Sequence, residues 1–150
     1  MNERISNFIL QQTCASICCM DEKGHPYCFT CFYSFDSEEV LLHYKSSNET
    51  RHSVLLLRHP LVAGTILPDS LSLLQIRGIQ FEGFILPFDH SHTKSASSHF
   101  HQKHPVALAV PGEIWTVKLT SIKFTDNTLG FGKKLIWSRE ELSPDGNKSI

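Results

Sequence analysis

The first 46 residues contain three apolar, strand-like segments separated by short turns, and this pattern constrains the fold more than any other. Residues 13–20 are rich in cysteine and in small or branched side chains, and residues 26–35 are strongly aromatic. The tetrapeptide at residues 21–24 is typical of a hairpin turn, and a second turn at residues 36–37 precedes a third strand at residues 39–46. Two successive hairpins predict an antiparallel meander.

Short helices are expected in two or three places around the strands. Asn2 can cap a first helix, in which Ile5, Phe8 and Ile9 form one apolar face. A second short helix begins after the third strand and is stopped by Pro60. The polar, histidine-rich residues 89–104 are expected to form a loop followed by a third helix.

The rest of the chain adds more strands. The pattern predicts them at residues 61–67, 71–87, 114–124 and 135–137, whereas the polar residues 138–150 are expected to fray. Gly78 and Gly83 in the long strand indicate bends or bulges, as in a barrel strand that must curl. Six or seven antiparallel strands with two or three short helices predict a mainly β fold, a β-barrel with flanking helices.

Composition limits the class of protein. A chain of 150 residues with 41% hydrophobic residues has the size of one domain and can bury a core without staples. The formal charge of -1 argues against nucleic-acid binding through a basic face. No apolar run is long enough for a transmembrane helix, and the first residues lack signal-peptide features, so a cytoplasmic protein with no membrane partner is expected.

The five cysteines all lie in the first third of the chain. The odd count, together with the expected cytoplasmic setting, argues against a disulfide framework. Cys28 and Cys31 have the spacing of a redox or zinc motif, but positions three apart in a strand face opposite sides. No second cysteine pair follows to complete a zinc site. We therefore expect the cysteines to be small buried apolar residues.

A candidate phosphate site lies where the third strand ends and the second helix begins. The helix start, capped by Asn48 or Thr50, offers unpaired backbone N–H groups and the positive end of the helix dipole. Ser46, Ser47 and Thr50 add hydroxyl groups, while Lys45 and Arg51 add positive charge. This chemistry can bind a phosphate. The alternative is an ordinary capped helix with solvated charges.

The long strand carries three polar candidates, Gln75, Arg77 and Gln80. In a barrel, side chains on one strand face can reach a ligand that lies across the outer wall, and a glutamine amide can meet the edge of a heteroaromatic ring. The alternative is that these residues lie on a wet face of the sheet.

Histidines are concentrated in one excursion, at positions 90, 92, 99, 101 and 104 (His90, His92, His99, His101 and His104). His101 and His104 at i, i+3 can share a helix face and form a metal pair. Apart from Asp89, no acidic residue or cysteine nearby completes a ligand set, so no metal site is predicted. The sequence also contains no nucleophile elbow, dinucleotide-binding fingerprint or P-loop, and the catalytic residues stay unknown.

The segment at residues 122–137 reads as a strand, an Asp126-Asn127 turn, and an aromatic residue between Gly130 and Gly132. It ends in a lysine pair, Lys133 and Lys134, and a short aromatic strand. The combination indicates either a surface that meets a flat anionic ligand or another subunit, or a strand pair that closes a small barrel.

In order and spacing, five segments of the chain resemble a known superfamily. They are residues 21–26, 49–52, 62–65, 76–83 and, as the longest and most specific, 124–137. The chain resembles the FMN-binding split-barrel proteins related to pyridoxamine 5'-phosphate oxidase, and within them it is most similar to the YhbP-type family. The resemblance covers roughly residues 3 to 138. We expect residues 1–138 to form an FMN-binding split β-barrel domain, followed by a polar tail at residues 139–150.

The resemblance implies a homodimer with FMN at the subunit interface. In the oxidase, a Ser-Arg-Lys turn holds the FMN phosphate, and here Thr50-Arg51-His52 matches that turn, preceded by Lys45 and Ser46. The glutamine expected on the long strand falls at or near Gly78, with Gln75 and Gln80 as displaced candidates, and of these Gln80 is the choice for the flavin ring edge.

Other positions depart from the oxidase pattern. Phe29 and Ser34 replace an arginine and a lysine on the second strand, and Thr125 replaces a late tryptophan. Pyridoxamine phosphate oxidation is therefore not expected. The resulting hypothesis is an FMN-dependent, oxidoreductase-like protein with a small-molecule substrate that the sequence does not identify. The alternative is a non-enzymatic dimer that binds or senses flavin or haem, because imidazole is a common axial ligand of haem iron.

Overall fold

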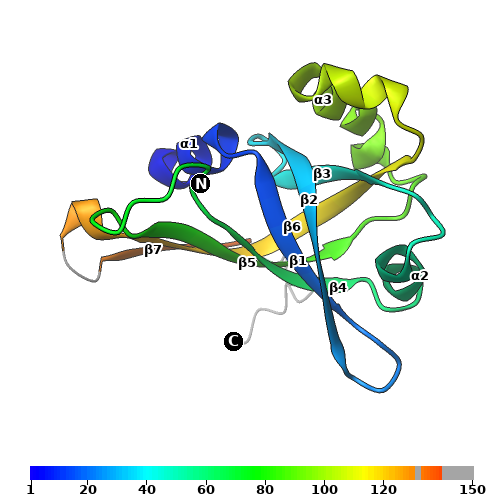
Figure 1. The fold of residues 1–150 in the computed structure, drawn as a ribbon, viewed down its shortest axis with the longest axis horizontal. Coiled ribbons are helices and arrows are strands. Elements are labelled where there is room, and N and C mark those ends of the chain that lie inside the picture. The colour runs from blue at the N-terminus through cyan, green and yellow to red at the C-terminus, as the bar shows by residue number, and fades with distance from the viewer. Residues whose placement is uncertain (131–132, 140–150) are drawn as a thin grey trace, which may run out of the picture.

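The computed structural model describes residues 1–130 and 133–139, and these form one antiparallel sheet that closes into a barrel (Figure 1). The strand order is β3-β2-β1-β4-β5-β6-β7, and β3 also pairs with β6. Six strands therefore complete the barrel and β7 is an additional strand, as in a split barrel. The strands are β1 (Cys14–Met20), β2 (Pro26–Asp36), β3 (Leu41–Ser46), β4 (Leu61–Ile66), β5 (Arg77–Ile85), β6 (Glu113–Asp126) and β7 (Lys134–Ser138).

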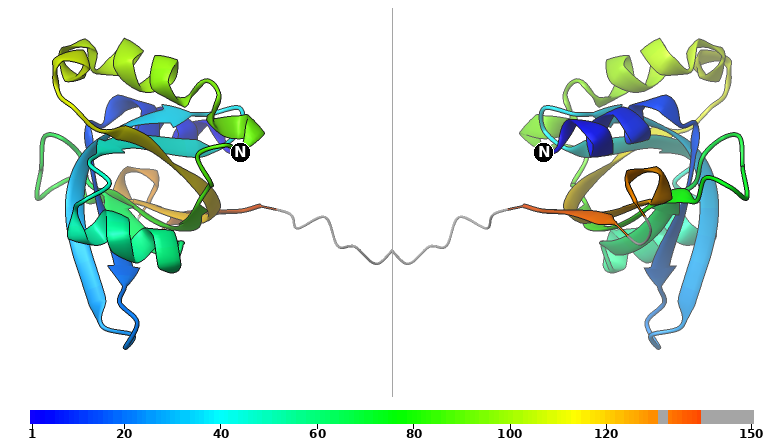
Figure 2. Two further views of the ribbon diagram at one scale, coloured as in Figure 1. Left: turned by 90° about the vertical axis from the view of Figure 1, so that its right-hand side faces the viewer. Right: turned by 90° about the vertical axis from the view of Figure 1, so that its left-hand side faces the viewer.

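Three α-helices flank the barrel, as the sequence predicts. They are α1 (Glu3–Gln11), α2 (Arg51–Arg58) and α3 (Ala96–Lys103), and short 3₁₀ turns occur at η1 (Ser91–Thr93), η2 (Pro105–Ala109) and η3 (Asn127–Leu129). In all the views α1 and α3 lie on the same side of the barrel, whereas α2 lies at another edge (Figures 1 and 2). The β1–β2 hairpin extends away from α1 and α3 (Figure 1), and Glu22 in its turn pairs with Arg58 of α2.

Helix α1 covers one side of the barrel core. The Asn2 side chain caps the helix by accepting a hydrogen bond from the Arg4 amide. Its predicted apolar face is buried, and the Phe8 ring lies 4.9 Å from that of Phe124 in β6. The buried Tyr33 hydroxyl donates to the carbonyl of Ile9 at 2.6 Å, so the helix end is fixed to β2.

Strand β6 is long enough to pair with β3, β5 and β7, and its pairing with β5 contains a bulge between Glu82 and Gly83. This confirms the irregularity predicted at Gly83, where the two backbones approach closely. No register shift occurs at Gly78, which pairs regularly with Thr125, so β5 has no bulge there.

We expect Gly83→Ala to lower the free energy of unfolding by ~1–3 kcal/mol, the usual cost of overpacking. A Cβ at this position would lie 2.5 Å from the backbone oxygen of Lys118, which cannot move without disturbing the sheet. Gly78→Ala is the matched control, because its Cβ would meet no atom closer than 3.5 Å. Urea unfolding followed by circular dichroism compares them, and equal stabilities would contradict the close approach.

The long strand predicted at residues 71–87 was too long at its start. The strand begins at Arg77, and the residues before it form a loop in which Leu73 and Leu74 are 97% and 89% exposed. The apolar run has no partner strand, because the preceding β4 already ends at Ile66, opposite Ile79. The loop is instead held by Asp69, which accepts a hydrogen bond from the Thr13 amide at 2.9 Å.

The expectation for the cysteines was wrong in two respects, their pairing and their burial. Cys18 and Cys28 form a disulfide across the β1–β2 hairpin, because the hairpin register places them directly opposite each other with their Cα atoms 4.2 Å apart. Cys28 is exposed, not buried. Cys28 and Cys31 do lie on opposite faces of β2, as the strand period predicts, and of the free cysteines only Cys19 is buried.

The C-terminal part is described only in part. The predicted turn is confirmed at Asp126, whose carboxylate accepts a hydrogen bond from the Thr128 amide at 3.0 Å, whereas the aromatic residue between the two glycines lies outside the described residues. The predicted tail also lies outside them except for Arg139, which donates to the Leu119 carbonyl at 2.9 Å. Among the helices described, none is long and apolar enough to cross a membrane.

Candidate functional site

A cleft of about 450 Å³ lies between the barrel, the start of α2 and the segment that contains α3 and η2. Its aromatic walls come from Phe29 and Phe32 of β2, Tyr44 of β3 and Phe100 of α3. Its polar end is formed by residues 45–47 and His52. The volume falls within the range that proteins use for small molecules and cofactors, roughly 300–1,000 Å³.

The polar end of the cleft is built by the cap of α2. Thr50 is the N-cap, and its hydroxyl oxygen accepts a hydrogen bond from the Ser53 amide at 3.3 Å. Ser46 Oγ and Thr50 Oγ1 lie 2.8 and 3.0 Å from Nε2 of His52. The structure thus brings together three predicted site residues at a helix N-terminus, where backbone N–H groups have no partner inside the helix.

His52 is a neutral member of this group near pH 7. Burial lowers the pKa of its imidazole from the ordinary value. The ring stacks on Phe29, with centroids 3.8 Å apart and planes 10° from parallel. Phe29, where the oxidase pattern has an arginine, therefore packs against His52, where that pattern has a lysine. With these two residues the cleft is less positive than it would be with an arginine and a lysine.

Lys45 is the only lysine or arginine among the described residues that line the cleft. Its Nζ donates to the carbonyl of Ala107 at 2.8 Å and lies 3.3 Å from Nε2 of His101. Lys45 consequently fastens the α3–η2 segment over the cleft while it supplies positive charge beside Ser46.

Two predicted site residues lie elsewhere. Arg51 is exposed and does not line the cleft, because its guanidinium lies over the ring of Tyr27, 4.7 Å from the centroid. Gln80 is exposed on β5 and lines a second cleft of about 560 Å³, together with Thr65 and Lys123. Within one chain the structure therefore brings together Lys45, Ser46, Thr50 and His52, but neither Arg51 nor Gln80.

The two other candidates on the long strand lie outside both clefts. Gln75 belongs to the exposed loop before β5. Arg77 has a structural contact, since its Nε lies 3.3 Å from Asp126 Oδ2 and its guanidinium covers the Phe8 ring at 5.1 Å. Lys134 begins β7 and is exposed.

The histidine excursion contributes separate contacts, not the i, i+3 metal pair considered from the sequence. His101 faces Lys45, whereas His104 ends the helix and lies with Nε2 2.7 Å from the Tyr33 carbonyl oxygen. His92 Nδ1 lies 3.3 Å from the carboxylate of Glu39.

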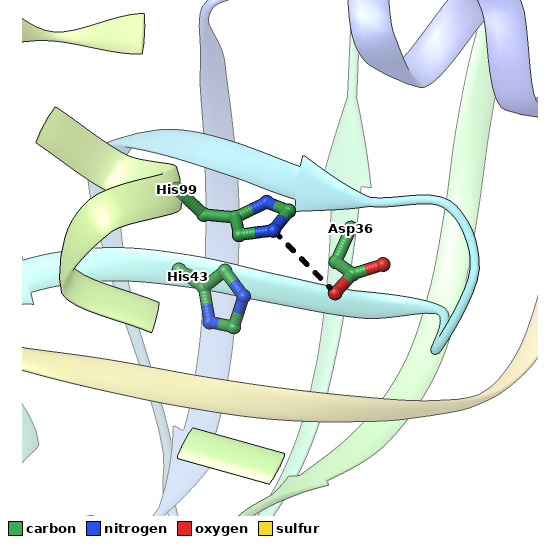
Figure 3. Close-up of side chains that lie close together, drawn as sticks. All are labelled: Asp36, His43 and His99. Carbon is green, nitrogen blue, oxygen red and sulfur yellow. Dashed lines mark ion pairs between the residues drawn. The ribbon is translucent and has the colours of Figure 1, made fainter. Parts of the chain in front are cut away.

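His99 belongs to a cluster of possible metal ligands that the sequence pattern did not predict. It projects from α3 toward Asp36 of β2 and His43 of β3 (Figure 3), and one potential ligand atom from each lies within 4.8 Å of the others. Burial, with a smaller contribution from His99, lowers the pKa of His43 to about 4. The feature that could have indicated part of this cluster is the register of the β2–β3 hairpin. It pairs Ser34 with His43 and places Asp36 on the same face of the sheet as His43.

Solved structures of low sequence identity share this split-barrel fold. A haem-binding protein from Mycobacterium smegmatis matches with a TM-score of 0.74 and 12% identity over 87% of this chain, which spans 55% of that protein's length. A FAD-binding protein from Mesorhizobium loti matches with a TM-score of 0.65 and 12% identity, over 84% of this chain and 94% of that one. HutZ, a haem storage protein from Vibrio cholerae, matches with a TM-score of 0.60 and 13% identity over 79% and 87%. Because the identities are this low, these structural matches establish the fold alone.

Sequence relatives identify the family. A UPF0306 protein of Photorhabdus laumondii is 40% identical over 113 residues, 75% of this chain and 79% of the relative. The UPF0306 protein YhbP of Salmonella schwarzengrund is 38% identical over 122 residues, 81% of this chain and 83% of the relative. The chain belongs to the UPF0306 (YhbP) family. No protein-family model matches it.

Proposed function

We propose that this protein binds a flavin nucleotide, FMN, with the phosphate at the start of α2 and the ring in the aromatic part of the cleft. The proposal rests on one observation: a single cavity has a polar end and aromatic walls. Hydroxyl groups, a lysine and a helix N-terminus lie at one end, and Phe29, Phe32 and Tyr44 line the rest. Phosphate favours the first surface and a planar ring the second. The FAD-binding protein of Mesorhizobium loti has the same fold.

Each predicted residue has a role in this proposal. Ser46 and Thr50 donate hydrogen bonds to phosphate oxygens, and Lys45 balances their charge. His52, stacked on Phe29, donates through a ring nitrogen to the phosphate. Arg51 is exposed and can leave the ring of Tyr27 to reach a phosphate at the helix start.

A homodimer with the cofactor at its interface completes the proposal. Gln80 lies in a separate cleft of the same chain, so it can meet the flavin ring edge only from a second copy. Exposed apolar side chains on the sheet support such contact, since Phe32 is 59% exposed and Ile136 is 73% exposed. Burial of apolar surface is the main driving force for association.

A bound flavin would supply redox chemistry, while the chain binds it, orients it and excludes water. We therefore propose an oxidoreductase-like activity on a small molecule, distinct from pyridoxamine phosphate oxidation because Phe29 and Ser34 offer no cation to a substrate phosphate. Anaerobic reduction of the reconstituted protein by NADH or NADPH tests the activity. Binding of flavin without reduction by either donor would favour storage or sensing.

Haem binding is the second candidate, favoured by histidines near the aromatic walls. His101 Nε2 lies 3.3 Å from Nζ of Lys45, which lines the cleft. His104 lines an adjoining cleft together with Phe32. Two proteins with this fold are a haem-binding protein and a haem storage protein. Titration of the purified protein with FMN, FAD and haemin separates the candidates. A flavin spectrum with quenched fluorescence supports the first, a Soret band the second, and neither would refute both.

Arg51→Ala is expected to weaken FMN binding by ~1.5–3 kcal/mol, the contribution of a charge-assisted hydrogen bond. Isothermal titration of wild-type and variant protein with FMN measures the change. Arg58→Ala is the matched control, because Arg58 is at the opposite end of the same helix and pairs with Glu22. Equal affinities for the two variants would remove Arg51 from the phosphate site.

A further inference from the structure

Asp36, His43 and His99 come from three different elements and converge beside the barrel, outside the cleft described above. His99 Nε2 lies 3.9 Å from Asp36 Oδ2, and the rings of His43 and His99 are 5.9 Å apart and meet at 60°. Figure 3 shows both imidazole rings and the carboxylate turned toward one another. Two imidazole nitrogens and one carboxylate oxygen form a set of metal ligands.

Hydrogen bonds to the second polar atom of each side chain hold His43 and Asp36, the two strand residues, in place. His43 Nδ1 lies 3.0 Å from the hydroxyl of Thr116 in β6, which leaves Nε2 as the nitrogen available to a ligand. Asp36 Oδ1 accepts hydrogen bonds from the amides of Glu38 and Glu39 at 3.0 and 3.1 Å, which leaves Oδ2 toward His99. Such supporting hydrogen bonds orient metal ligands in proteins and fix the histidine tautomer.

One of these ligand atoms also lacks any partner. The side chain of His43 is 0% exposed, and its Nε2 has no hydrogen bond among the described residues. Ser34 Oγ, on the residue opposite His43 in the sheet, is likewise buried and unpaired. An unsatisfied buried polar group destabilises the folded chain, so a bound group that satisfies Nε2 would stabilise this site.

We propose that Asp36, His43 and His99 bind one divalent transition-metal ion of the zinc class. Calcium and magnesium favour sites made of oxygen atoms, whereas zinc and similar ions bind imidazole together with carboxylate. Three protein ligands leave a fourth position for water or another small ligand. The site binds metal independently of any flavin or haem.

Closing the site requires a small movement of one ligand. Zinc bonds of ~2.0–2.1 Å in a tetrahedron place ligand atoms about 3.4 Å apart, whereas the three atoms here lie within 4.8 Å. His99 is the ligand able to move, since its side chain is 41% exposed while that of Asp36 is 11% exposed. A bound ion would draw His99 inward and tie α3 to β2 and β3. Because Phe100 follows on the same helix, the ion would also steady one wall of the cofactor cleft.

Tag-free protein treated with EDTA and titrated with Co²⁺ tests the proposal. We expect visible d–d bands that saturate at one ion per chain and disappear when Zn²⁺ is added, with no competition from Mg²⁺. His99→Ala should weaken Co²⁺ binding by at least ~10-fold, since loss of a supporting group alone has that effect. The partly exposed position of His99 allows this variant to fold, which circular dichroism verifies.

His25→Ala is the matched control. His25 forms the exposed pair with Asp21 at 3.2 Å on the β1–β2 turn, and its loss should leave Co²⁺ binding unchanged. Thr116→Val keeps all three ligands but removes the hydroxyl beside His43, and it should weaken binding by ~10-fold or more. Absence of one-to-one Co²⁺ binding in the wild-type protein, or equal binding by the His99 and His25 variants, would overturn the proposal.

Discussion

Trp115→Ala is expected to lower the free energy of unfolding by ~3–5 kcal/mol, the range for removing a fully buried tryptophan. Trp115 in β6 is 0% exposed. Its ring stacks at 6.2 Å on that of Tyr44 and meets the ring of Phe88 edge-on at 5.0 Å. Alanine would leave a cavity between strands whose register fixes their separation, so the neighbours cannot collapse into it. Chemical denaturation followed by circular dichroism measures the loss.

The same residue links the core to the proposed cofactor site. Trp115 Nε1 donates to the carbonyl of Ser46 at 3.3 Å, at the point where β3 leads into the cap of α2. Trp115→Phe is therefore a graded control, which keeps an aromatic ring but loses this hydrogen bond, worth ~1 kcal/mol. A loss for Trp115→Ala no larger than for Trp115→Phe would contradict the packing role.

Much of the fold could be predicted because its signals are local. The apolar face of α1, the turn at residues 21–24 and the cap of α2 all depend on residues within one or two turns of chain. The exposed leucines at residues 71–76 could not be placed in the same way, because a strand needs a partner and β4 ends too early to supply one. The disulfide required the hairpin register, which pairs Cys18 with Cys28.

The polar end of the cleft was also predictable, since Ser46, Thr50 and His52 lie within seven residues of one another around a helix start. The position of Arg51 over Tyr27 was not, because side-chain direction at an exposed helix start depends on the neighbouring strand. The cluster of Asp36, His43 and His99 joins a strand pair to a helix more than fifty residues later. Only the tertiary fold brings such residues together.

Acid is expected to destabilise the metal-free protein partly through His43. Its folded-state pKa of about 4 lies below the ordinary value of 6.5, because burial and the nearby His99 oppose the charged form. Below pH 6.5 the unfolded chain therefore binds a proton that the folded chain does not. This contribution to stability is present above pH 6.5 and is lost as the pH falls toward 4. The loss between pH 7 and pH 4 is ~2–3 kcal/mol.

The change has to be isolated from other groups that act in the same direction. The pKa of His52 is also lowered by burial, and its protonation likewise favours the unfolded chain in acid. The comparison is therefore made between wild-type protein and His43→Gln, both in EDTA, through the difference in unfolding free energy between pH 7 and pH 4. The variant lacks the titrating imidazole, so it should lose ~2–3 kcal/mol less than the wild type over this interval. If the unfolding free energies of the two proteins fall in parallel, His43 accepts a proton in the folded state as readily as in the unfolded chain. The lowered pKa of the buried His43 imidazole would then be wrong.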